Sequence, residues 1–171
     1  MRRTKAAPSL PNMITRTATG PDTSWRDRLG LPVPVLLALS LLGAPRVVLH
    51  DLDLIQEGTL VNALFVFGPP VIWVAVAVLR RVPHPLWTLL AIGAGYGVFL
   101  ALGHQLLWHL SFPEPPRLGG NLSGLEPGVQ AVIVRAFSAL SSLFTGLVVG
   151  AITGLIAWGL SALRPGRPSS R

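Results

Sequence analysis

Residues 129–163 read VQAVIVRAFSALSSLFTGLVVGAITGLIAWGLSAL and contain one charged side chain, Arg135. Strands of a membrane barrel alternate apolar and polar residues, and this segment has no such alternation, so it predicts an α-helix. A helix of this length measures ~52 Å, which exceeds the ~30 Å hydrocarbon core of a bilayer. We therefore expect either that its first two turns stand among the headgroups or that the helix breaks.

A stripe of five small residues follows this segment at four-residue spacing. A second small stripe, Gly93 and Gly97, lies in the apolar block 85–110. Small residues at this spacing let another backbone approach closely, as in a glycine zipper. The partner is left open between the 85–110 segment and another chain, either a second copy or a different membrane protein. The five residues are Ser138, Ser142, Gly146, Gly150 and Gly154.

Three further apolar blocks precede this segment, at about 31–49, 60–79 and 85–110. Half of the residues are apolar and only 12% are charged. Each block is long enough to cross a bilayer as a helix. The chain is thus predicted to be an all-α integral membrane protein with a four-transmembrane-helix bundle in residues 29–163. Residues 1–28 are expected to form a disordered basic tail, and residues 164–171 a short C-terminal tail.

The basic residues predict the orientation of the bundle, because cytoplasmic flanks of spans carry excess Lys and Arg. Eleven basic residues lie in the two tails and in the link between the second and third blocks, and three lie on the other side with five of the seven acids. Both termini, and therefore both tails, are predicted to be cytoplasmic (N-in/C-in). The three basic residues on the external side are Arg46, Arg117 and Arg135.

Two proline sites predict irregular helices. Pro45 is expected to kink or end the first span near its external end. Pro69 and Pro70, in the middle of the second block, remove two backbone donors. This pair is compatible with a kink repaired by neighbouring helices or with a broken helix whose free carbonyls line a solute path. We favour the kink, because no matching break occurs elsewhere in the sequence.

Composition excludes several function classes. The net charge of +7 does not indicate nucleic-acid binding, since the basic residues lie in tails and at the ends of spans. The chain has no cysteine for thiolate chemistry, no Asp or Glu inside a predicted span for proton coupling, and no nucleotide-binding or hydrolase motif. We expect no metal and no cofactor. Arginine outnumbers lysine, whose one residue is Lys5, which suggests a bacterial protein of the cytoplasmic membrane, crossing it several times.

Polar side chains gather near the external side, within about two helical turns of the interface. They are compatible with three interpretations: residues solvated by headgroups, a site for a small anion, lipid headgroup or metal, or a b-type haem held by His50 and His104. The candidate ligand-binding residues are Arg46, Asp51, Asp53, Asn62, His104, Gln105, His109 and Arg135.

These patterns favour a non-enzymatic membrane protein. It would be an accessory subunit or a permease-like binder of a small ligand at the external polar cluster, and its partners would include the lipid bilayer. The alternative is a membrane enzyme that acts on lipid or on an exported substrate, with His104 as base and Arg135 as anion clamp. For Arg135 we expect an inward orientation, with an acceptor from the cluster: Asp51, Asp53, Asn62 or the ring of neutral His104.

Overall fold

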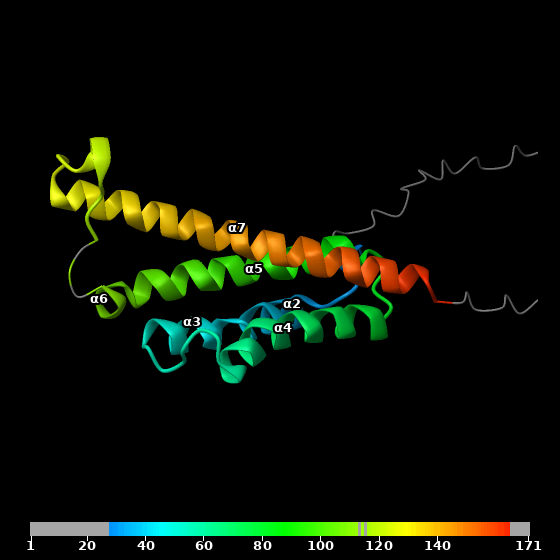
Figure 1. Ribbon diagram of the computed structural model, residues 1–171. Helices are drawn as coiled ribbons and strands as arrows, with labels where there is room; N and C mark the ends of the chain where they lie inside the picture. Colours follow the sequence, from blue (N-terminus) through cyan, green and yellow to red (C-terminus); the bar gives the residue numbers. More distant parts are fainter. Residues whose placement is uncertain (1–27, 113, 115, 165–171) are drawn as a thin grey trace, which may run out of the picture.

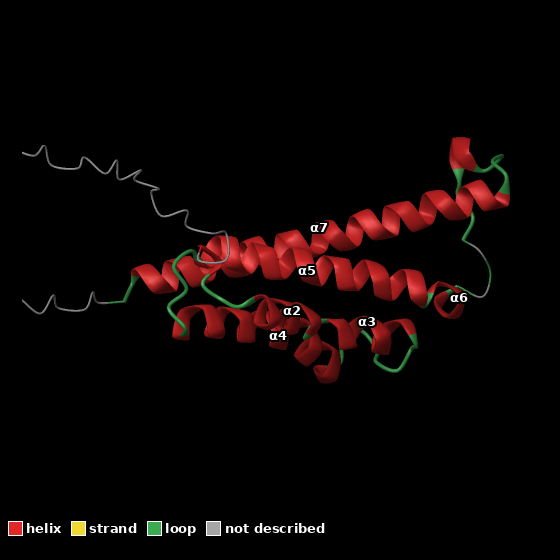
Figure 2. Cartoon of the chain, turned by 180° about the vertical axis from the view of Figure 1, so that it is seen from behind, coloured by secondary structure: helices red, strands yellow, loops and turns green. Residues whose placement is uncertain are grey.

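The computed structural model describes residues 28–112, 114 and 116–164, and Figure 2 shows only helices and loops across them. The predicted tails lie outside this part except for Arg28 and Arg164. Four helical segments are long and apolar enough to cross a membrane. The first combines α2 (Val33–Leu41) and α3 (Ala44–Asp51), and the others are α4 (Leu60–Leu79), α5 (Pro85–Leu106) and α7 (Pro127–Ala162). Short helices α6 (Trp108–Ser111) and η1 (Gly120–Leu122) precede α7 (Figure 1).

The proline positions shape α3 and α4 differently. Pro45 lies in the first turn of α3, where its missing N–H needs no partner, and the break between α2 and α3 precedes it at Leu42 and Gly43. The helix of the second block runs unbroken from Leu60 to Leu79 through Pro69 and Pro70. The proline pair therefore changes the local bonding of α4 without ending the helix.

The last two helical segments begin or end at other residues than predicted. The predicted 85–110 segment divides at Leu107, which separates α5 from α6. By contrast, α7 is one unbroken helix of 36 residues. Its first turns extend past the end of α3 (Figure 1). Glu126 stabilises this start by accepting a hydrogen bond from the Val129 backbone N–H at 3.2 Å.

The backbones of α5 and α7 approach each other closely. A Cβ added at Gly146 would lie 2.5 Å from the Gly97 nitrogen, and one added at Gly150 would lie 2.6 Å from the Leu89 carbonyl oxygen. A Cβ on Gly93 would collide with the Gly146 carbonyl oxygen. The small residues of α7 therefore face α5 of the same chain. A second copy could use this stripe only if the two helices separated.

A second glycine face of α5 receives the first span. A Cβ at Gly95 would lie 2.5 Å from the Ser40 hydroxyl, and one at Gly103 would lie 2.9 Å from a Val47 methyl. The Ser40 hydroxyl donates a hydrogen bond to the Ile92 carbonyl at 2.9 Å, which ties α2 to α5. Since α5 also contacts α4, it is the central helix of the bundle.

Large side chains fill the space beside these close contacts. Trp73 of α4 is fully buried, and its indole N–H donates to the Leu39 carbonyl at 2.8 Å. Its ring meets Tyr96 edge-on, with ring centroids 5.6 Å apart. Leu89 and Ile92 of α5 are fully buried in the same cluster. The core therefore lies around α5, where all four spans meet.

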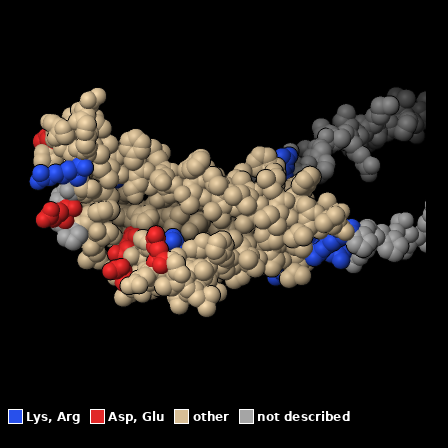
Figure 3. All heavy atoms as spheres, viewed as in Figure 1, with Lys and Arg blue, Asp and Glu red and all other residues tan. Residues whose placement is uncertain are grey.

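The outer surface of the spans is apolar, and the charges gather at the two ends. Exposed residues include Phe67, Phe137 and Phe144. Figure 3 shows the acidic side chains together at one end of the molecule, with some basic ones among them, and basic side chains without acidic ones at the other end. We call these the acidic end (Asp51, Asp53, Glu57, Glu114 and Glu126) and the basic end (Arg28, Arg80, Arg81 and Arg164).

The glycine contacts predict a sharp difference between two alanine substitutions in α7. Gly150→Ala places a methyl group against the α5 backbone, whereas Gly159→Ala places one in open space. We expect Gly150→Ala to destabilise the protein by about 1–3 kcal/mol through overpacking, and Gly159→Ala to be neutral or stabilising because alanine favours helix. Thermal unfolding of the purified variants in detergent measures both. Equal unfolding temperatures would contradict the α5–α7 packing.

Candidate functional site

A polar cleft opens between α3, α5 and α7 toward the acidic end. Its volume is about 250 Å³. Figure 3 shows the surface hollowed between α7 and the helices opposite it, with acidic side chains at the rim. Helix α5 lies between α3 and α7 and forms the floor, while small hydroxyl side chains of α7 leave the space open. The lining residues are Arg46, Val47, His50, Asp51, Tyr96, Leu100, His104, Ser138, Ser141, Ser142 and Thr145.

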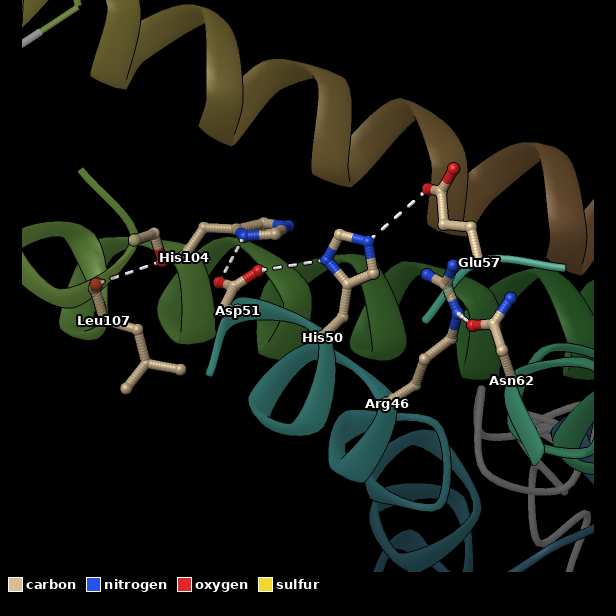
Figure 4. A network of polar contacts seen from close by, with 8 residues as sticks. Arg46, His50, Asp51, Glu57, Asn62, His104 and Leu107 are labelled. Carbon is tan, nitrogen blue, oxygen red and sulfur yellow. Dashed lines mark hydrogen bonds and ion pairs between the residues drawn. The ribbon is translucent and has the colours of Figure 1, made fainter. Parts of the chain in front are cut away.

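Asp51 is the centre of a polar network in this cleft (Figure 4). Its carboxylate is only 7% exposed and lies 2.8 Å from Nδ1 of His104 and 3.7 Å from Nδ1 of His50. The other ring nitrogen of His50 lies 3.4 Å from a Glu57 carboxylate oxygen. An ionised carboxylate only accepts hydrogen bonds, so Nδ1 of His104 carries a hydrogen. In the neutral ring, Nε2 of His104 is then the basic nitrogen.

Local helix geometry explains which residues join the network. Arg46 and His50 are four residues apart on α3 and share a face. Asp53, by contrast, has φ +55° and follows the last turn of α3, where its N–H donates to the His50 carbonyl at 3.0 Å. Asp53 is exposed and follows the end of the helix. It is not among the residues that line the cleft.

Arg46 is the basic residue that lines the cleft. Its Nε donates to the side-chain oxygen of Asn62 at 3.2 Å. Asn62 is held in the first turn of α4, where its backbone N–H donates to the Thr59 hydroxyl. Among the described residues this is the one hydrogen bond of the Arg46 guanidinium. Its two terminal amino groups therefore keep their donors for another acceptor.

A second cavity of about 170 Å³ continues from the first. The two share Arg46, Tyr96 and Thr145. The second is also lined by Phe65 and Val66, whose carbonyls lie four residues before the two prolines of α4 and so lack their usual helical partners. The cavity thus has potential backbone acceptors on an otherwise apolar wall. Its other lining residues are Gly43, Pro69, Pro70, Trp73 and Val149.

Arg135 lies apart from this cleft. Its guanidinium carbon is 5.0 Å from the centre of the Trp108 ring, in a cation–π contact. Its Nε is buried and has no hydrogen bond in the described part of the chain. Of the acceptors expected for it, Asp51 and His104 pair with each other and Asn62 accepts from Arg46. Arg135 therefore packs against protein with an aromatic partner in place of the carboxylate or amide acceptor that we expected.

Two other candidate residues also lie outside the lining of the cleft. Gln105 donates to the backbone carbonyl of Arg135 at 3.1 Å, which links α5 to α7. His109 is exposed on α6. The structure thus brings together Arg46, Asp51, Asn62 and His104 from the predicted cluster, with His50 beside them. Gln105 and Arg135 meet at a separate α5–α7 contact, and His109 is exposed on α6.

Several cleft residues were not predicted as site residues. Tyr96 was not among the candidate residues, and Ser138 and Ser142 were expected only to pack. Ser142 donates to the Ser138 carbonyl at 2.8 Å, and both line the cleft together with Ser141 and Thr145. These four hydroxyl residues recur at three- and four-residue spacing on α7. This spacing places them on one polar face of the helix, and that pattern in the sequence could have identified them as site residues.

The arrangement favours some chemistries over others. In the described residues, no group of three or more His, Asp or Glu side chains could hold a metal ion. His50 contacts carboxylates through both ring nitrogens, so neither is free to bind haem iron. What the cleft offers is a guanidinium with free donors, a carboxylate-bound imidazole and several hydroxyl groups. These groups suit the binding of a polar or anionic group.

The chain matches no protein-family model, and comparisons with curated proteins and with solved structures give no significant match.

Proposed function

We propose that this protein crosses a bacterial cytoplasmic membrane four times, with both termini in the cytoplasm and the cleft open to the outside. The four long apolar helices and their apolar outer surface support insertion in a membrane. The separation of the basic end from the acidic end supports the orientation, since basic residues are retained on the cytoplasmic side. In this orientation the acidic end and the cleft face outward.

Within the membrane, we propose that the protein is a non-enzymatic binder of a small anionic ligand, either as a permease-like binder or as an accessory subunit. The observation that carries this proposal is Arg46, which lines the two adjoining cavities with its terminal amino groups unused in the described structure. A charged side chain at the bilayer centre costs about 2.5–3.5 kcal/mol on insertion scales, and less toward the interface. A ligand anion would offset part of this cost by pairing with the guanidinium.

The remaining charges of the cleft support an anion at Arg46 in preference to a protein carboxylate. Asp51 already accepts from His104 and lies beside His50. Asn62 fixes the guanidinium through Nε alone, which leaves the two terminal amino groups for a bidentate acceptor. The hydroxyl groups of Ser141 and Thr145 line the opposite wall. An anion bound there would have donors on two sides.

This function predicts that ligand retention depends on Arg46. The protein is purified in mild detergent, and the small molecules it carries are extracted and identified by mass spectrometry. We expect Arg46→Gln to lose a species that the wild-type protein retains, because a hydrogen bond between charged groups contributes about 1.5–3 kcal/mol. Arg117→Gln, which changes an exposed arginine at the same end, is the control and should retain it. Identical extracts from all three proteins would contradict the proposal.

A second candidate function is favoured by the bond between Asp51 and His104. A carboxylate that holds Nδ1 of a histidine orients the ring and leaves Nε2 as a general base. In an ester hydrolase, His104 would take a proton from the attacking water and return it to the leaving alcohol, giving an acid and an alcohol. Arg46, which lines this cavity, would take the role of anion clamp that the sequence suggested for Arg135.

The enzyme hypothesis predicts fatty-acid release from extracted membrane lipids by the wild-type protein, measured by mass spectrometry. His104→Gln should abolish it, because glutamine cannot act as a base. His109→Gln changes an exposed histidine outside the cleft and should leave the rate unchanged. Release at the same rate by wild type and His104→Gln, or no release by any of the three proteins, would reject this candidate.

A further inference from the structure

An apolar groove lies between α4 and α7, next to the second cavity of the cleft. Its volume is about 470 Å³, and it shares Val66, Pro70 and Val149 with the second cavity. The second cavity in turn shares Arg46 with the polar cleft. The three spaces therefore adjoin in one series. The remaining groove residues are Phe67, Val71, Val74, Ile152, Thr153 and Ile156.

Along this series the lining changes from polar to apolar. At the acidic end it offers Arg46, His104 and Asp51. At the other end the residues are almost all hydrocarbon, and several are on the outer surface, such as Val71 and Ile152. A small hydrophilic ligand would use only the first part. A molecule with a polar head and a hydrocarbon chain would match the whole series.

The distance from the polar cleft to the far end of the groove corresponds to the depth of one leaflet. Thr145, which lines both the polar cleft and the second cavity, precedes Ile156 at the far end of the groove by eleven positions on α7. This distance is about 16 Å along the helix axis, or about half of the ~30 Å hydrocarbon core. An acyl chain of an outer-leaflet lipid covers that depth.

We propose that the ligand is a phospholipid of the outer leaflet, with its phosphate at Arg46 and one acyl chain in the α4–α7 groove. This inference rests on the proposed function and names the class of its ligand. A phosphate oxygen pair matches the unused fork of the guanidinium. The exposed carboxylate of Glu57 contacts His50 of the cleft and complements an ammonium on the headgroup, so phosphatidylethanolamine is the probe of choice.

The test uses the full chain, purified in a maltoside detergent that carries no phosphate. The probe is phosphatidylethanolamine with a photoactivatable diazirine at the end of one acyl chain, and labelled residues are mapped by mass spectrometry. We expect labelling of the groove residues of α4 and α7. Unlabelled phosphatidylethanolamine should displace the probe, whereas diacylglycerol with the same chains and no phosphate should not.

Three variants test the two parts of the site. Arg46→Gln should weaken labelling roughly ten-fold through loss of the charged hydrogen bonds, and Ile152→Trp should block it by filling the groove. Leu147→Trp is the matched control, because Leu147 is 41% exposed against 54% for Ile152 and lies about 140° round the helix. It should label like wild type. Both tryptophans are on the outer surface, so folding is expected in each case.

Four results would overturn the lipid inference. Equal loss of labelling in Ile152→Trp and Leu147→Trp, or equal displacement by diacylglycerol, would show that the lipid is only part of the surrounding layer. Displacement by glycerophosphoethanolamine as effective as by the intact lipid would show that the site needs no chain, which leaves the proposed anion binding intact. Labelling that is unaffected by Arg46→Gln would remove both the lipid inference and the proposed function.

Discussion

The close approach of α5 and α7 is the constraint on which the rest of the structure depends. In a bilayer the lipid is as apolar as a helix surface, so helices associate through tight packing and hydrogen bonds. Gly93, Gly146 and Gly150 provide that packing, because a side chain at any of them would meet the facing backbone. With α7 fixed on one side and α2–α3 on the other, α5 becomes the floor of a cleft between them.

The cleft keeps its polar character because the side chains that line it use only part of their hydrogen-bonding capacity on one another. Asp51 is bound by His104, and Asn62 by Arg46, so the costly carboxylate and amide both have partners. The serine and threonine residues of α7 follow the same pattern: Ser142 bonds back to its own helix and still faces the cavity. What remains is an excess of donors, chiefly on the Arg46 guanidinium, and an anionic ligand is the natural complement of that excess.

Much of the fold could be predicted from the sequence, because the length and hydropathy of a span are local properties. The four helices were found with ends within a few residues, and the unbroken α4 agrees with the favoured interpretation of Pro69 and Pro70. Which of Arg46 and Arg135 lines the cleft could not be predicted from the local sequence. It depends on how α3 and α7 are rotated about α5, which places Arg46 in the cleft and Arg135 over Trp108. Tyr96 escaped prediction as a site residue for the same reason.

Thiol labelling tests most directly whether the cleft is water-filled and open to the outside, and the natural chain has no cysteine to remove. Single cysteines would replace Ser141 in the cleft, its exposed neighbour Leu140, which does not line the cleft, and Ser161 near the basic end. A membrane-impermeant maleimide applied to intact cells should label the cysteine at Ser141 and neither of the others, and Ser161 should react only after permeabilisation. Labelling at Ser161 in intact cells, or equal labelling at Ser141 and Leu140, would contradict an outward-open polar cleft.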